Sequence, residues 1–424
     1  MKQIIKNGFV VNPASGFAGK ADILINYGVI ERVAENINDL DAKIIDATGK
    51  TVIPGLVDLH VHFREPGFEY KEDIETGSRA AAKGGVTTVL CMPNTNPPID
   101  SAALVEYVIN RGKKTGLINV LTTGTITKGL KGTELTEVAE LKAAGASALS
   151  DDGRPVSSSM IMRRALEYSN MLDMTIMAHC EDLDLVDNGS MNDGLICTEL
   201  GLRGIPKSAE SAAVSRDILL AEEVGARLHI CHVSTKNSID AVRSAKARGA
   251  KITAETAPHY FSLTDKACLG FNTNAKMNPP LRDDEDLNAV IEGLLDGTID
   301  AIATDHAPHH IDDKQVEFEK AANGIVGLET SLAVGYTYLV KSGKLTLLQL
   351  IEKMSTRPAK IINSDRGTLN VGAPADIVIF DENKEFTVDV NEFETKGKNS
   401  PYIGEKLFGK VERTIVGGKT VYLA

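Results

Sequence analysis

The sequence predicts an α/β protein whose centre is a closed (β/α)8 barrel. The middle of the chain alternates short apolar runs with helix-like stretches, as successive parallel β/α units do, with helices expected over residues 72–83 and 208–223. Eight such units favour a barrel, whose active site lies at the carboxyl ends of its strands; a doubly wound open sheet is the alternative. The predicted strands are residues 56–62, 86–91, 118–123, 146–150, 174–178, 228–232, 251–256 and 300–304.

The two ends of the chain predict a second, smaller unit. Residues 1–54 and 366–424 contain short β-like pieces with turn signals, such as residues 22–28 and 375–380. Neither end supplies enough strands for a stable sheet of its own. We therefore expect both ends to pack together as one small β-sandwich domain, with the catalytic barrel in residues 55–365.

Composition excludes several classes of partner. The chain of 424 residues has a formal net charge of −12 and lacks a basic tract, so nucleic acid and anionic membranes are not expected to bind it. Its five cysteines are scattered and suggest neither a disulfide framework nor a zinc knuckle. No stretch approaches the ~20 apolar residues of a membrane span, and a cytoplasmic location is expected.

A pair of histidines ends the first predicted strand. His60 and His62 are one residue apart, and alternate side chains of a strand point to the same face, so both imidazoles can reach one metal ion. Asp58 and Arg64 share this phase, and Asp58 is expected to orient a ligand. The competing interpretation is that both histidines are core residues with ordinary hydrogen bonds. Residues further along the chain decide between the two interpretations.

Further polar residues follow other predicted strands of the barrel. Four histidines and two aspartates would meet at its carboxyl end, and imidazole and carboxylate suit zinc and similar divalent ions. Asp152 is expected to shape the turn before Gly153 instead, and His229 to face the helices, because it lies three residues before His232. The six candidate ligands are His60, His62, Asp151, His179, His232 and Asp305.

With these residues in place, the chain resembles the amidohydrolase superfamily and, within it, the bacterial dihydroorotases of the longer, first type. The resemblance extends over essentially the whole chain and implies a TIM-like metallo-dependent hydrolase barrel. Its motifs are DLHVHFREPG at 58–67, CMPNTNP at 91–97, SDDG at 150–153, MAHCED at 177–182, ICHVS at 230–234, ETAPH at 255–259, KMNPPLR at 276–282 and ATDHAPH at 303–309.

The resemblance implies a site and a reaction. One or two zinc ions would be held by the six candidate ligands, with Asp151 bridging, and the substrate by Arg64, Asn94, Asn278 and His309. The family hydrolyses dihydroorotate to N-carbamoyl-aspartate and closes the ring in pyrimidine synthesis. Our hypothesis for the mechanism is attack of a metal-activated water on the ring amide, with Asp305 carrying the proton to the leaving nitrogen.

Several alternatives stay open. Many relatives bridge their metals with a carboxylated lysine, but the nearest lysine here, Lys142, lies in the preceding helix. This departure, together with Arg64, argues against a dihydropyrimidinase, hydantoinase or allantoinase. The other rival is an inactive scaffold subunit for aspartate carbamoyltransferase, and an association with that enzyme is left open. A homodimer is expected, and residues 306–327 are either a mobile lid or an ordinary surface loop.

Overall fold

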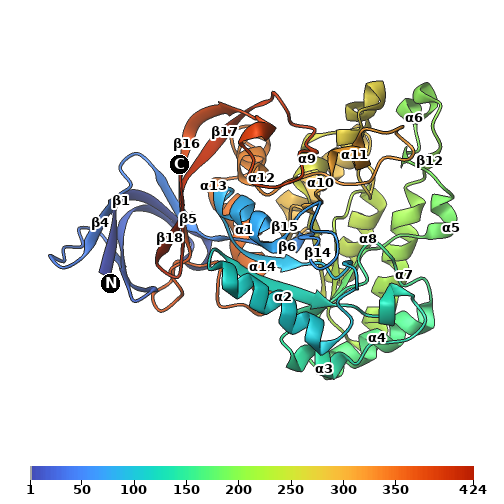
Figure 1. The fold of residues 1–424 in the computed structure, drawn as a ribbon, viewed down its shortest axis with the longest axis horizontal. Coiled ribbons are helices and arrows are strands. Elements are labelled where there is room, and N and C mark those ends of the chain that lie inside the picture. Colours follow the sequence, from blue (N-terminus) through green and yellow to red (C-terminus); the bar gives the residue numbers. More distant parts are fainter. Residues whose placement is uncertain (1) are drawn as a thin grey trace.

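Eight short apolar runs form the parallel strands of a barrel in the computed structural model, which describes residues 2–424 (Figure 1). Their order is β15-β14-β13-β10-β9-β8-β7-β6. The eight predicted strands are thereby confirmed. The barrel strands are β6 (Leu56–Val61), β7 (Val86–Cys91), β8 (Asn119–Gly124), β9 (Ala148–Leu149), β10 (Ile176–Ala178), β13 (Leu228–Ile230), β14 (Ile252–Thr256) and β15 (Ala301–Ile302).

The barrel closes between its first strand and the segment that follows its last. Val61 and His306 form an isolated parallel bridge, and the His62 amide donates to the His306 carbonyl at 2.8 Å. Three residues before Val61 in β6, Asp58 accepts from the Thr304 amide at 3.0 Å and from the Thr304 hydroxyl at 2.6 Å. Asp58 therefore joins the first and last strands, and it also accepts from the His60 amide at 3.1 Å.

Small and apolar side chains fill the barrel interior, while a second apolar layer faces the helices. Leu59, Met177 and Ala301 belong to the interior cluster, whereas Ile176 and Ile230 pack outward. Both faces of each strand are thus buried, which explains why the strands read as continuous apolar runs. The helices of this layer are α1 (Ile74–Lys83), α2 (Ala102–Thr115), α3 (Val138–Ala143), α4 (Ser159–Met171), α7 (Ser208–Val224), α8 (Lys236–Ala247), α10 (Asp284–Asp296), α12 (Ser331–Gly335), α13 (Leu347–Ile351) and α14 (Arg357–Ile361).

Local signals set the ends of these helices. Asp73 caps α1 by accepting from the Thr76 amide at 2.8 Å, and Asp283 caps α10 in the same way. Short helices lie in the loops above the barrel, namely α5 (Leu183–Val186), α6 (Leu195–Leu200), α9 (Pro258–Ser262) and α11 (Ile311–Lys314). The short pair β11 (Met191–Asn192) and β12 (Gly204–Ile205) lies among them. Within residues 2–424, no helix has both the length and the apolar character needed to span a membrane.

Both ends of the chain contribute to one further sheet, beside the barrel (Figure 1). Strand β5 pairs antiparallel with β16, which joins the two ends, and Ile23, Ile377 and Ile415 lie in the core of this unit. The expected terminal β unit is thereby found, while its boundaries at residues 54 and 365 remain predictions. Its strands are β1 (Lys2–Asn12), β2 (Phe17–Asn26), β3 (Val29–Ala34), β4 (Lys43–Asp46), β5 (Thr51–Pro54), β16 (Ile377–Thr387), β17 (Lys406–Val416) and β18 (Lys419–Leu423).

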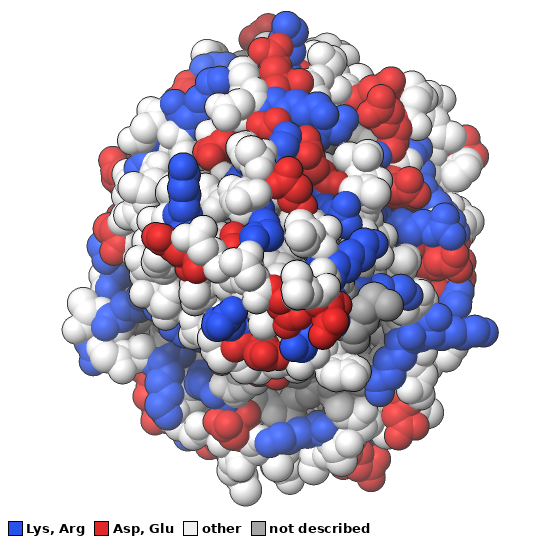
Figure 2. Space-filling model, turned by 90° about the vertical axis from the view of Figure 1, so that its left-hand side faces the viewer, with Lys and Arg blue, Asp and Glu red and all other residues white. Residues whose placement is uncertain are grey.

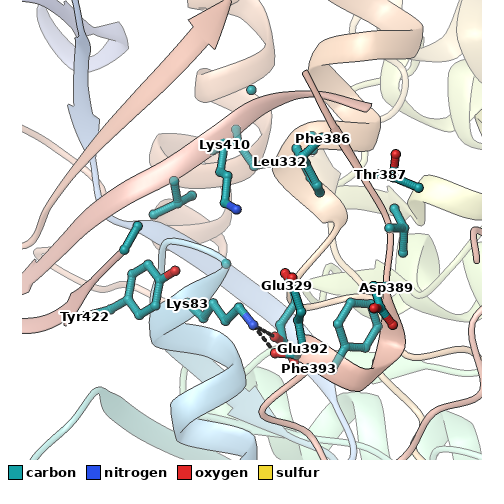
Figure 3. Close-up of a pocket in the computed structure, with 16 residues that line it drawn as sticks. Lys83, Glu329, Leu332, Phe386, Thr387, Asp389, Glu392, Phe393, Lys410 and Tyr422 are labelled. Atoms are coloured by element: carbon teal, nitrogen blue, oxygen red, sulfur yellow. Dashed lines mark hydrogen bonds and ion pairs between the residues drawn. The ribbon is translucent and has the colours of Figure 1, made fainter. Parts of the chain in front are cut away.

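The surface of this terminal unit carries acidic and basic side chains interspersed with one another (Figure 2). Between the terminal sheet and the barrel lies a pocket of about 220 Å³ (Figure 3). Its floor includes an ion pair from Lys83 of α1 to Glu329 at 3.1 Å, and its walls include Lys410 and Tyr422. None of the predicted site residues lines this pocket, so it is separate from the candidate site.

Candidate active site

His60 and His62 both point toward the mouth of the barrel, where other polar side chains gather. The Nδ1 atom of His62 lies 2.9 Å from Oδ1 of Asn94, and its Nε2 atom lies 3.1 Å from Oδ1 of Asp305. The Nδ1 atom of His60 lies 3.0 Å from Oε1 of Glu255. Each imidazole is thus held by one ring nitrogen and presents the other to the same region, as metal-binding histidines do.

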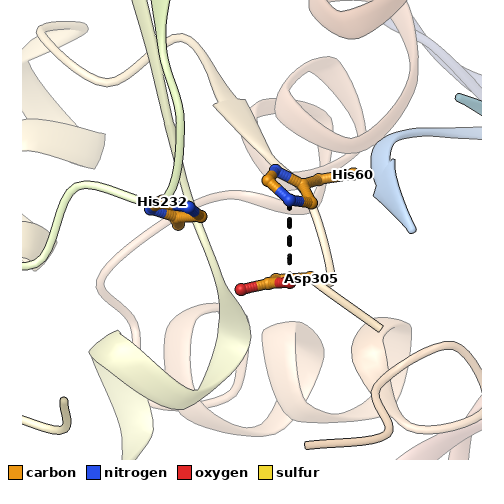
Figure 4. Close-up of side chains that lie close together, drawn as sticks. All are labelled: His60, His232 and Asp305. Atoms are coloured by element: carbon orange, nitrogen blue, oxygen red, sulfur yellow. Dashed lines mark ion pairs between the residues drawn. The ribbon is translucent and has the colours of Figure 1, made fainter. Parts of the chain in front are cut away.

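His179, His232 and Asp305 come from other strand ends and complete the cluster. Nδ1 of His179 lies 2.9 Å from Nε2 of His232, and Nε2 of His60 lies 3.7 Å from Oδ1 of Asp305 (Figure 4). His60, His232 and Asp305 place one ligand atom each within 4.8 Å of one another. Five of the six predicted ligands therefore meet where the sequence placed them.

The sixth predicted ligand, Asp151, points away from this cluster, and that prediction is wrong. Its carboxylate accepts from the amides of Ile126 at 2.7 Å and Thr127 at 3.1 Å, and from the Thr127 hydroxyl. Asp152 takes the expected place, with Oδ1 3.3 Å from Nε2 of His60. The physical reason is local: both residues lie beyond the two-residue strand β9, and the Ile126 and Thr127 amides with the Thr127 hydroxyl hold the Asp151 carboxylate away from the cluster.

Asp152 lies between the two halves of the histidine set. Its Oδ1 atom is 3.6 Å from both Nδ1 of His179 and Nε2 of His232, while Oδ2 is 3.5 Å from Nε2 of His62. It thus forms one close group with His60 and His62 and another with His179 and His232. A carboxylate in this position can join two metal ions. The alternative of a lysine bridge is excluded, because the Lys142 ammonium donates to the Leu172 carbonyl on the exterior of the barrel.

The electrostatics of the cluster favour positive charge at its centre. Burial alone would raise the pKa of the Asp152 carboxyl, but the facing His60 and His232 hold that pKa well below its ordinary value. The pKa of Asp305 is likewise lowered by His60 and His62 despite burial. Conversely, the two carboxylates raise the pKa of His60 well above its ordinary value, although burial opposes this.

The donor set fits a divalent cation. His60 Nε2 and Asp152 Oδ1 are buried and have no hydrogen-bond partner in the described part of the chain. Buried polar atoms are rarely left in this state, which indicates that something else satisfies at least part of the set. Imidazole nitrogens and carboxylate oxygens are the ligands of zinc and related ions.

Strained backbone accompanies three of the site residues. Arg64, His232 and Asp305 have φ angles of 61°, 36° and 48°. These values lie in the left-handed region, which bulky residues rarely occupy. Such conformations persist where the surroundings over-determine them, and they concentrate at functional sites.

The four predicted substrate-binding residues line a cavity of about 190 Å³ beside the cluster; they are Arg64, Asn94, Asn278 and His309. Arg64 is half-buried, with Nε donating to the Pro308 carbonyl at 3.3 Å and NH2 lying 3.3 Å from Nε2 of His309. Its guanidinium makes no ion pair with a carboxylate anywhere in residues 2–424. Because a partly desolvated charge without a counterion is unfavourable, this cavity is suited to an anionic ligand.

The C-terminal part of the chain supports the wall of this cavity without lining it. Asn399, in the segment before β17, accepts from the His309 amide at 3.0 Å through Oδ1. Its Nδ2 group donates to the carbonyls of Ala307 at 3.0 Å and Gly324 at 2.9 Å. One side chain thus fixes the loop that carries His309. Sequence reasoning missed Asn399, because its partners lie about 75 to 92 positions away along the chain.

His229 and Glu255 form a layer beneath His60. His229 was expected to face the helices, but it points into the barrel, with Nε2 3.1 Å from Oε2 of Glu255 and Nδ1 2.8 Å from Oγ1 of Thr253. The expectation failed because His232 lies beyond the end of β13 with φ of 36°, so the alternation cannot be counted back from it. Glu255 was missed as well, although its position in a predicted strand and in phase with Thr253 could have signalled it.

Comparison with known proteins places these features in a family. A family model described as dihydro-orotase-like matches residues 49–238, and one described as amidohydrolase family matches residues 225–422. A curated relative from Ruminiclostridium cellulolyticum, named dihydroorotase, is 56% identical over 421 residues, covering 99% of this chain and 98% of the relative. The chain belongs to the dihydroorotase family. A second curated dihydroorotase, from Acetivibrio thermocellus, is also 56% identical, over 99% of this chain and 98% of the relative.

Solved structures show that the dihydroorotase family shares its whole fold with hydantoinases. The L-hydantoinase (dihydropyrimidinase) of Arthrobacter aurescens matches with a TM-score of 0.90 at 28% identity, over 99% of this chain and 96% of that one. The D-hydantoinase (dihydropyrimidinase) of a Thermus species matches with a TM-score of 0.85 at 27% identity, over 100% and 96%. This dihydroorotase family member is a cyclic amidohydrolase, and the fold by itself does not select its substrate.

Proposed function

We propose that the protein catalyses the reversible hydrolysis of dihydroorotate to N-carbamoyl-L-aspartate, using divalent metal ions. The observation that carries this proposal is Arg64, a half-buried guanidinium without a carboxylate partner in the described chain, in the cavity beside the His/Asp cluster. Both compounds carry a carboxylate, whereas dihydrouracil, hydantoin and allantoin carry none. A guanidinium can bind a carboxylate through two parallel hydrogen bonds.

His60, His62, His179, His232, Asp152 and Asp305 would hold the metal. Bound there, a divalent ion acidifies water and polarises a carbonyl oxygen. Glu255 and Asn94 contact Nδ1 of His60 and of His62, which orients these rings with Nε2 toward the cluster.

Asp305 has the environment of a proton carrier. It lines the cavity, and the facing His60 and His62 lower its pKa, so it is ionised at neutral pH. As a carboxylate it can accept a proton from the attacking water. Once protonated it is a strong acid, and it can deliver the proton to the leaving ring nitrogen. Ring closure would use the same two transfers in reverse.

Arg64, Asn278 and His309 would bind the substrate so that the ring amide faces the cluster. His309 lies between two cations, with Lys71 Nζ 3.3 Å from its Nδ1 and Arg64 NH2 3.3 Å from its Nε2. Burial, with these cations, lowers the pKa of His309 to about 2, so its ring is neutral. A neutral imidazole can accept as well as donate a hydrogen bond.

Four further proposals rest on the family resemblance. They are zinc as the metal, a homodimer, a cytoplasmic location and an association with aspartate carbamoyltransferase. The inactive-scaffold alternative is disfavoured, since such a subunit needs no metal site and this chain has the full donor set. Hydantoinase activity is favoured only by the shared fold.

The test is a substrate panel on purified protein with measured metal content. We expect turnover of dihydroorotate and of N-carbamoyl-L-aspartate, and much slower turnover of dihydrouracil, hydantoin and allantoin. Activity on the last three without activity on the first pair would overturn the proposal. A metal-loaded protein inactive on every substrate would favour the scaffold alternative.

A further inference from the structure

Two buried lysines lie beside the substrate cavity. Lys276 is 5% exposed and Lys314 is 3% exposed, and neither makes an ion pair with a carboxylate in residues 2–424. Taking an ammonium group out of water is strongly unfavourable unless other polar groups replace the water. The two side chains are therefore expected to be retained for what they bind.

Both ammonium groups are solvated by backbone carbonyls of one short segment. Lys276 Nζ donates to the carbonyls of Glu319 and Ala321, each at 2.8 Å. Lys314 Nζ donates to Ala322 at 2.7 Å and to Gly324 at 3.1 Å. An ammonium has three donors, and the third of Lys314 reaches the Lys276 carbonyl at 3.4 Å. Four carbonyls of residues 319–324 are thus turned inward onto two lysine amino groups.

Further contacts reinforce this arrangement. The Gly324 amide donates to the Lys276 carbonyl at 2.9 Å, so the backbones of the two segments are joined directly. Lys276 Nζ also lies 5.5 Å from the centre of the Phe318 ring, a buried cation–π contact. The Thr273 hydroxyl donates to the Lys314 carbonyl at 2.7 Å, which fixes the end of α11.

The residues held in this way form part of the wall of the cavity. Met277 and Asn278 follow Lys276 directly and line the cavity, as does Asn323. The Asn323 carbonyl lies 2.9 Å from Nε2 of His309. Without the two lysine side chains, the inward-turned carbonyls of residues 319–324 would lose their hydrogen-bond donors. The contact from Asn323 to His309 depends on the same stretch of backbone.

We propose that Lys276 and Lys314 are positioning residues that fix residues 319–324 as a permanent wall of the substrate cavity. Residues 319–324, in the second half of the segment 306–327, are then not a freely moving lid. Opening them would remove the carbonyl partners of two buried lysine side chains. The expected effect on substrate binding rests on the proposed function, whereas the expected effect on the mobility of residues 319–324 does not.

The experiment compares Lys276→Met and Lys314→Met with Lys320→Met. Lys320 lies in the same segment with its side chain 74% exposed, so it controls for the loss of a lysine there. Amide hydrogen exchange is measured across residues 315–324, and KM and kcat for N-carbamoyl-L-aspartate are measured at equal metal content. We expect exchange at least about tenfold faster in the first two variants, and KM raised about tenfold or more with a smaller change in kcat.

Exchange in residues 315–324 that matches the Lys320→Met control would overturn the proposal. If a methionine variant is recovered unfolded, the corresponding leucine variant, which likewise has no donor, is judged by the same exchange criterion. Should the wild-type protein not turn over N-carbamoyl-L-aspartate, the proposed function fails, but the exchange measurement still decides whether the two lysines hold the segment.

Discussion

Oε1 of Glu255 lies 3.0 Å from Nδ1 of His60, while its other oxygen, Oε2, lies 3.1 Å from Nε2 of His229. The carboxylate is fully buried, and burial alone would raise its pKa. His229 and His60 outweigh this effect and lower the pKa of Glu255 to about 2. With a metal bound at the cluster, His60 would donate from Nδ1 to Glu255 and offer the lone pair of Nε2 to the metal.

The first prediction concerns this contact. Glu255→Gln removes the charge that fixes the His60 tautomer, and we expect metal affinity to fall about tenfold to a hundredfold. Competition with a chromophoric chelator measures it independently of activity. Glu199→Gln, at an exposed position, is the control. Unchanged metal affinity in Glu255→Gln would show that Glu255 is only a packing residue.

The second prediction separates the two aspartates at the end of β9. Asp152→Asn should lose most of its bound metal and lower kcat by at least about a hundredfold, because it removes the carboxylate between the histidines. Asp151→Asn should keep its metal but lose about 1 to 3 kcal/mol of stability, since the backbone amides of Ile126 and Thr127 lose a charged acceptor. Metal analysis and urea unfolding of both variants check this. The reverse pattern would restore Asp151 as the ligand.

The third prediction tests the carboxylate clamp. Arg64→Lys keeps the charge but not the planar pair of donors, so KM for N-carbamoyl-L-aspartate should rise about tenfold to a hundredfold. Arg111→Lys is the matched control, because Arg111 pairs with Glu65 outside the cavity at 2.9 Å. Equal KM values for Arg64→Lys and wild type would contradict the role of Arg64.

The fourth prediction addresses the proton carrier. Asp305→Asn should lower kcat by about a hundredfold to ten-thousandfold when its metal content is restored to the wild-type level, because an amide cannot accept and return the proton. The rate is measured in both directions with metal content determined on the same sample. A metal-replete variant that turns over at a near wild-type rate would rule out proton transfer by Asp305.

The fifth prediction uses a buried carboxyl away from the cluster. Burial, partly offset by Arg216, raises the pKa of Asp217 from 3.8 to about 6. The folded state then binds the proton more tightly than the unfolded state, so this group's stabilisation is complete below about pH 4 and is lost as the pH rises through 6. Relative to wild type, Asp217→Asn should gain about 3 kcal/mol of stability between pH 4 and pH 7.

Urea unfolding of Asp217→Asn and wild type at several pH values measures this difference. Asp41→Asn, at an exposed position, reports the effect of removing a solvated carboxylate. A stability difference between Asp217→Asn and wild type that does not change with pH would mean that Asp217 titrates alike in both states.

Much of this architecture could be predicted from local sequence. The eight strands were found because each is a continuous apolar run buried on both faces, and the His60/His62 pair because alternation within one strand is a local property. The ends of the strands set the limit. Strand β9 has only two residues, so Asp151 and Asp152 lie in a loop, where alternation along the strand does not say which of them faces the cluster.

Other features depend on contacts distant in sequence. Glu255 meets His60 across 195 positions, and no pattern near either residue reveals the pairing. The position of His232 depends on a left-handed backbone conformation that follows from packing around the site. Sequence reasoning therefore located the residues that carry the chemistry better than the residues that hold them.

The contact of Asn399 with the loop of His309 has a consequence for engineering and for evolution. Because this side chain comes from beyond the barrel, a chimaera that joins this barrel to the terminal segments of a hydantoinase would replace a residue that supports the wall of its own substrate cavity. Recombination at the boundary between the two units would therefore disturb the loop that carries His309.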